Sequence, residues 1–84
     1  MPVGTIRYWA AARAAAGCAE ESFDAPTLAE ALAVARAAHG QRLGAVLSRS
    51  SFLVDSAPVG SRPHDEVALS PGSVVEVLPP FAGG

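Results

Sequence analysis

The last two residues, Gly83 and Gly84, have the clearest chemical potential in this sequence, because they present a carboxylate with no side chain beside it. The pKa of a free α-carboxyl group is about 3.5, so the group is charged at neutral pH and is a poor electrophile. An enzyme that uses ATP can convert such a group to an acyl-adenylate, and a sulfur nucleophile can then displace AMP to give a thiocarboxylate. We therefore predict that Gly84 is the reactive residue and that other proteins act on it.

A stiff arm precedes the two glycines. Pro79 and Pro80 lack the backbone N–H that a sheet ladder requires, so strand pairing should stop there. Fully extended, residues 79–84 span about 20 Å at ~3.3 Å per residue. We expect residues 1–78 to form the folded domain and residues 79–84 to form a projecting tail. The residues predicted to enter a channel in a partner are Pro79, Pro80, Phe81, Ala82 and Gly83.

Alternating apolar side chains predict the strands that must hold this tail. Residues 3–9 and 73–78 both alternate, which indicates strands with one face against a core. On the second strand, Val75 and Val77 would face inward. The opposite face would carry an apolar patch beside the tail. We predict that this patch is the partner interface, made of Leu78, Phe81, Val74 and Trp9.

One long helix is predicted between these strands. Thr27 is placed as its N-cap with Glu30 three residues later, which is a capping box, and Gly40 is placed as its C-terminal stop. The apolar positions that repeat at helical spacing are Leu28, Ala31, Leu32, Ala35 and Ala38.

Shorter elements complete the order. Helical turns are predicted over residues 10–16, ending at Gly17, and around residues 43–47. Short strands are predicted over residues 20–24, 51–54 and 57–60, and a loop over residues 61–66. Strands arranged around one main helix indicate an α+β fold in which a mixed sheet packs on the helix. This is a β-grasp, or ubiquitin-like, architecture.

Composition limits the possible functions. The 84 residues make one domain with a net charge of −2, and the six cations are scattered arginines, so no nucleic-acid partner is expected. The sequence shows no basic region followed by an apolar stretch and no apolar run of membrane-spanning length. We therefore expect no membrane partner. A single cysteine suits a reducing compartment, and we expect a cytoplasmic location.

Internal catalysis is not predicted. Cys18, His39 and His64 show no metal-ligand spacing along the chain, so no metal site is expected. The chain also has no glycine-rich phosphate loop and no plausible nucleophile–base pair. We therefore expect no bound cofactor and no activity of the chain alone, with ATP used by a separate activating enzyme.

Residues 69–84 (LSPGSVVEVLPPFAGG) resemble the C-terminal signature of the MoaD/ThiS family of ubiquitin-like sulfur carriers. The Pro-Pro step before Gly-Gly is most similar to the small, sulfur-carrier subunit of molybdopterin synthase. Residues 8–13, followed by Gly17, are similar to the first strand and turn of that family. Ser73 departs from the pattern, since an acidic residue is frequent there, and Phe81 is bulkier than the usual aliphatic residue.

The resemblance implies a set of partners. An adenylating enzyme of the ubiquitin-activating type would activate Gly84, and a sulfurtransferase would supply the sulfur of the thiocarboxylate. The tail would then enter the large, catalytic subunit of molybdopterin synthase and donate sulfur to cyclic pyranopterin monophosphate.

Two other functions stay open at this point. A sulfur carrier could instead serve thiazole, cysteine or tRNA thiolation, although the Pro-Pro step disfavours the thiazole branch. A ubiquitin-like modifier would attach the same Gly-Gly end to lysines of target proteins. The fate of the activated tail separates a carrier from a modifier.

Overall fold

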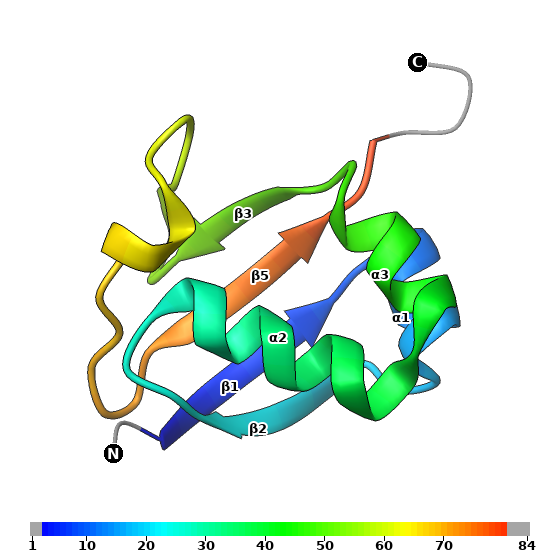
Figure 1. Ribbon diagram of the computed structural model, residues 1–84, viewed down its shortest axis with the longest axis horizontal. Helices are drawn as coiled ribbons and strands as arrows, with labels where there is room; N and C mark the ends of the chain where they lie inside the picture. The colour runs from blue at the N-terminus through cyan, green and yellow to red at the C-terminus, as the bar shows by residue number, and fades with distance from the viewer. Residues whose placement is uncertain (1–2, 81–84) are drawn as a thin grey trace.

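In the computed structural model, which describes residues 3–80, five strands form one mixed sheet and α-helices pack against it (Figure 1). The elements in chain order are β1 (Val3–Tyr8), α1 (Ala10–Ala16), β2 (Glu20–Asp24), α2 (Leu28–His39), α3 (Gln41–Leu47), β3 (Ser51–Val54), β4 (Ala57–Pro58), the 3₁₀ helix η1 (His64–Glu66) and β5 (Val74–Leu78). Helix α2 crosses one face of the sheet, as the sequence predicts, and α1 and α3 pack together at one end of it (Figure 1).

The C-terminal strand β5 lies at the centre of the sheet. The strand order is β2-β1-β5-β3-β4, with β5 parallel to β1 and antiparallel to β3. Tyr8 is opposite Val77, so β1 and β5 end together. The chain beyond β5 therefore leaves the sheet at the end of its central strand, between the ends of β1 and β3.

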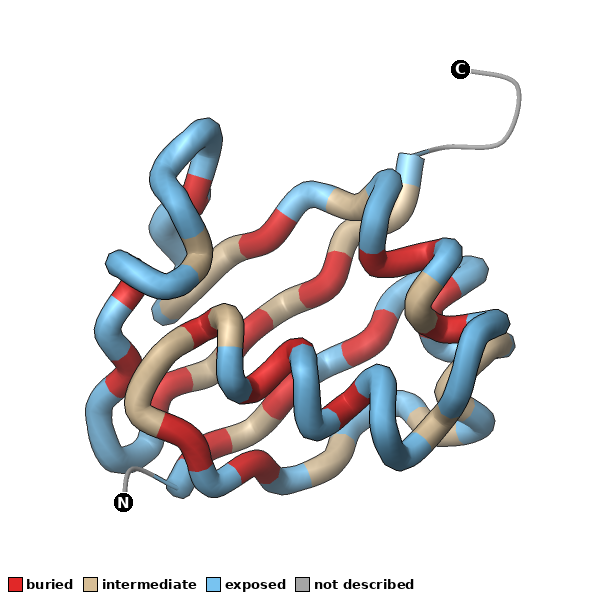
Figure 2. Tube along the Cα trace, in the orientation of Figure 1, coloured by how far each residue is buried: buried red, intermediate tan, exposed pale blue. Residues whose placement is uncertain are grey.

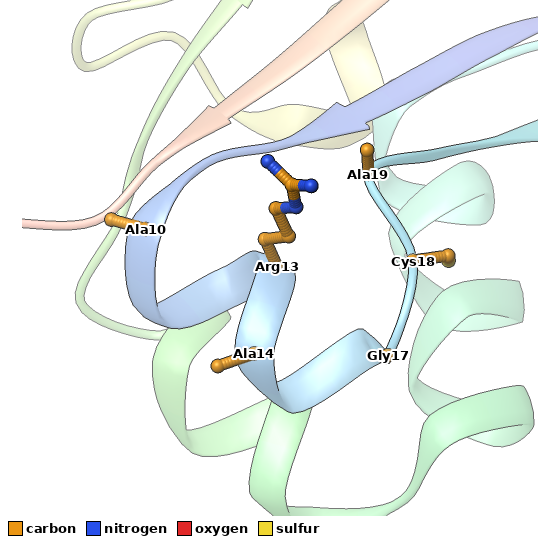
Figure 3. Close-up of a pocket in the computed structure, with 6 residues that line it drawn as sticks. All are labelled: Ala10, Arg13, Ala14, Gly17, Cys18 and Ala19. Atoms are coloured by element: carbon orange, nitrogen blue, oxygen red, sulfur yellow. The ribbon is translucent and has the colours of Figure 1, made fainter.

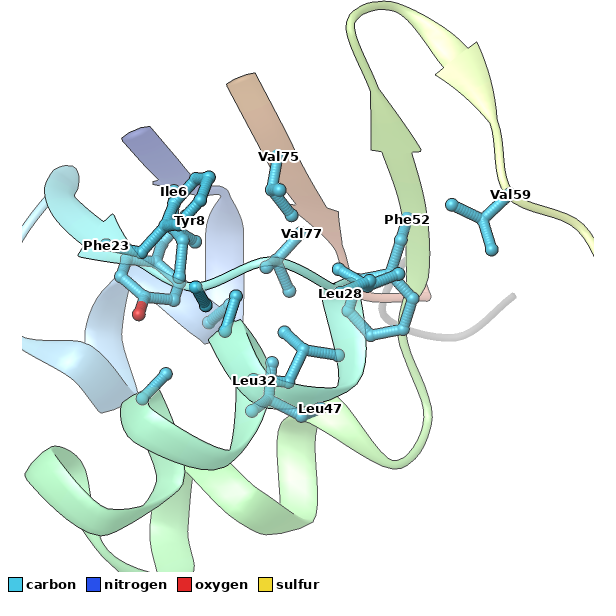
Figure 4. Packing of buried hydrophobic residues seen from close by; sticks show 14 of the residues in the cluster. Ile6, Tyr8, Phe23, Leu28, Leu32, Leu47, Phe52, Val59, Val75 and Val77 are labelled. Atoms are coloured by element: carbon cyan, nitrogen blue, oxygen red, sulfur yellow. The ribbon is translucent and has the colours of Figure 1, made fainter. Parts of the chain in front are cut away.

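The predicted alternation along the strands is confirmed. Ile6 and Tyr8 of β1 are each 2% exposed, and Val75 and Val77 of β5 are fully buried (Figure 2). These side chains pack against α2 and α3, and Figure 4 shows the strand residues facing the leucines of the helices. Burial of this apolar surface is the main favourable contribution to folding.

Helix α2 begins and ends where its capping residues predict. The Thr27 hydroxyl accepts a hydrogen bond from the Glu30 backbone N–H over 3.3 Å, and Gly40 ends the helix with φ of 80°. Ala38 was predicted on the buried stripe but is exposed, so that assignment is wrong. At about 100° per residue, Ala38 lies roughly 80° around the axis from Leu28, outside the face that contacts the sheet.

Several features differ from the sequence predictions, the first being that strand β1 ends at Tyr8 and not at Trp9. Strand β4 ends at Pro58 and not at residue 60, because Gly60 turns the chain with φ of 62°. The segment predicted as a loop contains the turn of 3₁₀ helix η1. Strand β5 begins one residue late because the buried hydroxyl of Ser73 donates to the Asp55 carboxylate and accepts from the backbone N–H of Ser70.

No helix within residues 3–80 is long and apolar enough to cross a membrane.

Candidate functional site

The predicted tail begins at the end of the central strand of the sheet. Strand β5 ends at Leu78, which is paired with Ser51 of β3. Pro79 and Pro80 follow, the first half-buried and the second exposed. Neither proline can donate a backbone hydrogen bond, which explains why the ladder stops there. The remaining predicted tail residues, Phe81, Ala82, Gly83 and Gly84, lie outside the described residues.

The face of β5 opposite the helices carries Val74 and Leu78, two of the residues predicted to form the partner interface. Val74, Glu76 and Leu78 alternate with the buried valines and are each half-buried. Leu53 of β3 lies beside Glu76 in the register and is also half-buried. We use the term open-face patch for the apolar side chains of this surface, namely Val74, Leu78, Leu53 and Trp9.

Trp9 belongs to this patch and not to the core. Its side chain is 47% exposed, and its indole Nε1 donates a hydrogen bond to Oε1 of Glu76 over 3.2 Å. Its backbone N–H donates to the Val77 carbonyl over 3.3 Å, so the residue lies at the end of the sheet from which the tail leaves. The structure therefore brings together Trp9, Val74 and Leu78, while their binding of a partner stays a prediction.

Charged residues frame the open-face patch. The Arg7 guanidinium lies 3.4 Å from a carboxylate oxygen of Glu20, and Arg7 is also opposite Glu76 in the register of β1 and β5. Sequence reasoning missed these charges and Leu53 as parts of the surface, because their proximity depends on which strands are neighbours. The alternation within each strand was the only signal for them.

A second group of polar side chains lies away from this face. Cys18, Glu21 and His39 place a sulfur, a carboxylate oxygen and an imidazole nitrogen within 4.8 Å of one another. Burial, and secondly the charge of Glu21, raise the pKa of the Cys18 thiol. Sequence spacing gave no sign of this group, because His39 is 21 residues from Cys18 along the chain. These are the described residues that could hold a metal ion.

A shallow hollow borders the same turn on the other side. It is lined by α1 and by the link to β2, including Arg13, Cys18 and Ala19 (Figure 3). Figure 3 shows the Cys18 side chain directed away from Arg13. Cys18 lines this hollow and also belongs to the three-residue group, so the two features adjoin at this residue.

The mixed sheet, the single long helix across it and the central C-terminal strand define the β-grasp, or ubiquitin-like, class of proteins. The model of the ThiS family matches residues 6–84, almost the whole sequence. The chain therefore belongs to the ThiS family, and the predicted membership of the wider MoaD/ThiS group is confirmed.

Solved structures agree with this fold over nearly their full lengths. The small archaeal modifier protein 1 of Methanosarcina acetivorans superposes with a TM-score of 0.86 at 18% identity, covering 100% of this chain and 98% of the other. A putative molybdopterin converting factor subunit 1 of Pyrococcus furiosus gives a TM-score of 0.79 at 20% identity, covering 96% and 100%. A complex of subunits 1 and 2 of the molybdopterin-converting factor of Helicobacter pylori gives 0.71 at 18% identity, covering 98% and 99%.

These identities are low enough that the likeness establishes the fold alone. No curated protein of similar sequence was found. Function must therefore be argued from the site, because a shared fold supports different activities.

Proposed function

We propose that this chain is a sulfur carrier whose Gly84 carboxylate is adenylated, thiocarboxylated and used to donate sulfur to cyclic pyranopterin monophosphate within a molybdopterin synthase. One observation carries the proposal: the central strand β5 runs directly into a Pro-Pro-led segment that ends in Gly-Gly, in a chain matched by the ThiS family model through residue 84. A central strand is held by neighbours on both sides, so it provides a firm base for an arm that must reach into another protein.

The chemistry needs an external activating enzyme. Attack of the Gly84 carboxylate on the α-phosphorus of ATP forms the acyl-adenylate and releases pyrophosphate. Hydrosulfide, released when a thiol reduces the persulfide of a sulfurtransferase, then attacks the carbonyl carbon, AMP leaves and the thiocarboxylate remains. After sulfur transfer to the pterin, water restores the carboxylate. For this chemistry the chain supplies the acyl group, and ATP is bound by the adenylating enzyme.

Docking is assigned to the open-face patch. It lies beside Pro79, so a partner that covers it would also receive residues 79–84. Aromatic side chains at the centre of an interface commonly supply much of the binding energy, and Trp9 is exposed here. The Helicobacter pylori structure contains subunit 2 of its converting factor beside subunit 1, which supports a large subunit as one partner for this chain. We propose that the carrier meets these partners in the cytoplasm.

A second function calls for a test because one similar structure is a protein named as a modifier, with the TM-score of 0.86. A modifier would use the same adenylate but would form an isopeptide bond with a lysine of a target. The 84-residue sequence contains no lysine, so such an adduct would have to form on another protein.

Incubation with ATP, sulfide and a MoaD/ThiS-activating enzyme separates the two functions. A carrier should accumulate a thiocarboxylate at Gly84 and transfer its sulfur when pyranopterin and a large synthase subunit are added. A modifier should instead appear in higher-mass adducts that survive thiol reduction and carry a branch ending in Gly83-Gly84 on a lysine of the target. Formation of such adducts without thiocarboxylate would overturn the carrier proposal, and a chain without Gly84 is the control.

A further inference from the structure

Three side chains with different ligand atoms meet on the side of the fold where α2 ends. Cys18, Glu21 and His39 are all half-buried, and their sulfur, oxygen and nitrogen atoms lie within 4.8 Å of one another. The closest pair is Nε2 of His39 and Oε2 of Glu21, at 2.6 Å. The proposed tail chemistry uses none of these groups.

Three separate segments bring these residues together. Glu21 is the second residue of β2 and is paired with Ile6 of β1. Cys18 lies in the link before β2, directly after Gly17, which ends α1 with φ of 77°. His39 is the last residue of α2, just before the turn at Gly40. The turns at Gly17 and Gly40 therefore bring Cys18 and His39 next to Glu21 of β2. The positions of the three residues are set by the fold.

Tyr8 holds this cluster from inside the core. Its ring is 2% exposed and lies within the apolar cluster (Figure 4). Its hydroxyl donates a hydrogen bond of 2.5 Å to Oε2 of Glu21. The Tyr8 ring also meets the His39 ring edge-on, with centroids 6.1 Å apart. Hydrogen-bond partners of this kind commonly orient metal ligands and strengthen their binding.

The donor set indicates the class of ion. A thiolate favours borderline or soft metals over Mg²⁺ and Ca²⁺, while imidazole and carboxylate both suit Zn²⁺. Three protein ligands with water in a fourth position is a common tetrahedral arrangement for Zn²⁺.

The geometry requires only a modest adjustment. With bonds of about 2.0–2.3 Å, tetrahedral ligand atoms lie roughly 3.3–3.7 Å apart. The 2.6 Å contact between His39 and Glu21 would widen, and the Cys18 sulfur would approach from its position within 4.8 Å. Shifts of this size are within the range of side-chain rotation at the end of a helix and in a link.

We propose that Cys18, Glu21 and His39 form a binding site for a divalent metal of the Zn²⁺ class, with Tyr8 as the positioning residue behind Glu21. Binding replaces the thiol proton of Cys18, which passes to solvent, and breaks the hydrogen bond between His39 and Glu21. The Nε2 proton of His39 moves to Nδ1 of the ring or to solvent, so that Nε2 can coordinate the ion. The thiolate and carboxylate then balance the two charges of the ion. The site would tie the α1–β2 link to the end of α2, and it is independent of the proposed sulfur carriage by the tail.

Titration of the reduced full chain with Co²⁺, followed by displacement with Zn²⁺, tests this site. We expect one Co²⁺ per chain, a thiolate-to-cobalt charge-transfer band and tetrahedral ligand-field bands, all lost on addition of Zn²⁺. Cys18→Ser should abolish the charge-transfer band. His39→Gln removes a ligand and should weaken Co²⁺ binding by more than about 100-fold. Loss of a hydrogen-bond partner behind a ligand costs only about 10–100-fold. The matched control His64→Gln changes the other histidine of the sequence, which lies in η1, and should bind like the parent chain.

Tyr8→Phe adds a measurement that a purely structural role would not reproduce. It should lower the Co²⁺ affinity about tenfold while the tetrahedral spectrum is retained. Circular dichroism would establish that each variant is folded, and measurements at two protein concentrations would detect bridging of two chains through Cys18. The proposal is overturned by any of three results: no Co²⁺ binding by the folded parent chain, equal effects of the His39 and His64 changes, or a stoichiometry of one metal per two chains.

Discussion

The indole Nε1 of Trp9 donates a hydrogen bond to Oε1 of Glu76 over 3.2 Å, joining residues 67 positions apart in the sequence. The contact ties the end of β1 to the outer side of the central strand β5, two residues before that strand ends. It holds an exposed aromatic ring next to the root of the tail. This arrangement links the fold to the docking role that we propose for the open-face patch.

Trp9→Ala should weaken docking more than folding. The side chain is 47% exposed, so little core packing is lost, but a large aromatic surface leaves the proposed interface. We expect an affinity loss of at least about tenfold for a large subunit of molybdopterin synthase, equivalent to ~1.4 kcal/mol. Isothermal titration calorimetry with purified subunits would measure it.

Val34→Ala is the matched control for this substitution. Val34 is 56% exposed, but it lies on α2, away from the open-face patch. Its removal should leave the affinity unchanged. Equal losses for the two variants would contradict the assignment of the docking surface.

Gly4→Ala should lower the free energy of unfolding. A Cβ at this position would collide with the Ser73 carbonyl oxygen and would lie 2.6 Å from Cζ of Phe23. The Ser73 carbonyl oxygen also accepts a hydrogen bond from the Thr5 backbone N–H. It therefore cannot move away without disturbing the pairing of β1 with β5. We expect a loss of about 1–3 kcal/mol, measured by urea unfolding.

Gly44→Ala should have the opposite effect. Gly44 lies within α3, and an added Cβ would sit 3.9 Å from Cγ of Arg36, an ordinary contact. The variant should gain about 0.5–1 kcal/mol because alanine loses less entropy than glycine on forming a helix. A stabilised Gly4 variant, or a destabilised Gly44 variant, would contradict the packing described above.

Alkaline pH should destabilise the fold through Tyr8. Burial, and secondly the hydrogen bond to Glu21, raise its pKa far above the ordinary value of 10.0. Below pH 10 both the folded and the unfolded chain carry the phenolic proton, so the stability is fully present. Above pH 10 only the unfolded chain ionises, and the free energy of unfolding should fall by up to about 1.4 kcal/mol per pH unit.

Tyr8 is the only tyrosine in the sequence, so its ultraviolet phenolate signal reports this ionisation directly. The signal should appear only together with unfolding, and Tyr8→Phe should remove the loss of stability above pH 10. The Cys18 pKa is raised above 9.0 and adds a loss of the same sign, so a Cys18→Ser background gives the cleaner comparison. Phenolate formation near pH 10 in the folded chain would refute the buried placement of this hydroxyl.

Ser56→Gly should stabilise the hairpin between β3 and β4. Asp55 and Ser56 have φ of 50° and 70°, the left-handed pair that a two-residue type I′ turn requires. Glycine accepts this conformation without the cost of a Cβ, so we expect a gain of a few tenths to about 1 kcal/mol. Ser61→Gly, at an exposed position outside this turn, should give no gain in thermal unfolding, and a gain there equal to that at Ser56 would argue against the turn as the cause.

Features set by neighbouring residues were predictable from the sequence. The alternation in β1 and β5 predicted which valines are buried, and Thr27 with Glu30 predicted the start of α2. These features were accessible because strand pleating and helix capping depend on residues only two to four positions apart.

Features that depend on the arrangement of elements were not predictable. The contact of Trp9 with Glu76 depends on β1 lying parallel to β5, and the approach of His39 to Cys18 depends on where α2 ends over β2. Neither relationship leaves a local pattern in the sequence. The exposure of Ala38 shows the same limit, because the width of a buried helix stripe is set by the surface beneath it.

The most direct test of the sulfur-carrier proposal is the intact mass of the chain after incubation with ATP, sulfide and an activating enzyme of the family. We predict a mass increase equal to the replacement of one oxygen by one sulfur, located at Gly84 by fragmentation and lost when Gly84 is deleted. The Cys18→Ser variant should be charged equally well, which separates this test from that of the metal site. An unchanged mass, under conditions in which an established carrier is charged by its own activating enzyme, would contradict the proposal that Gly84 carries sulfur.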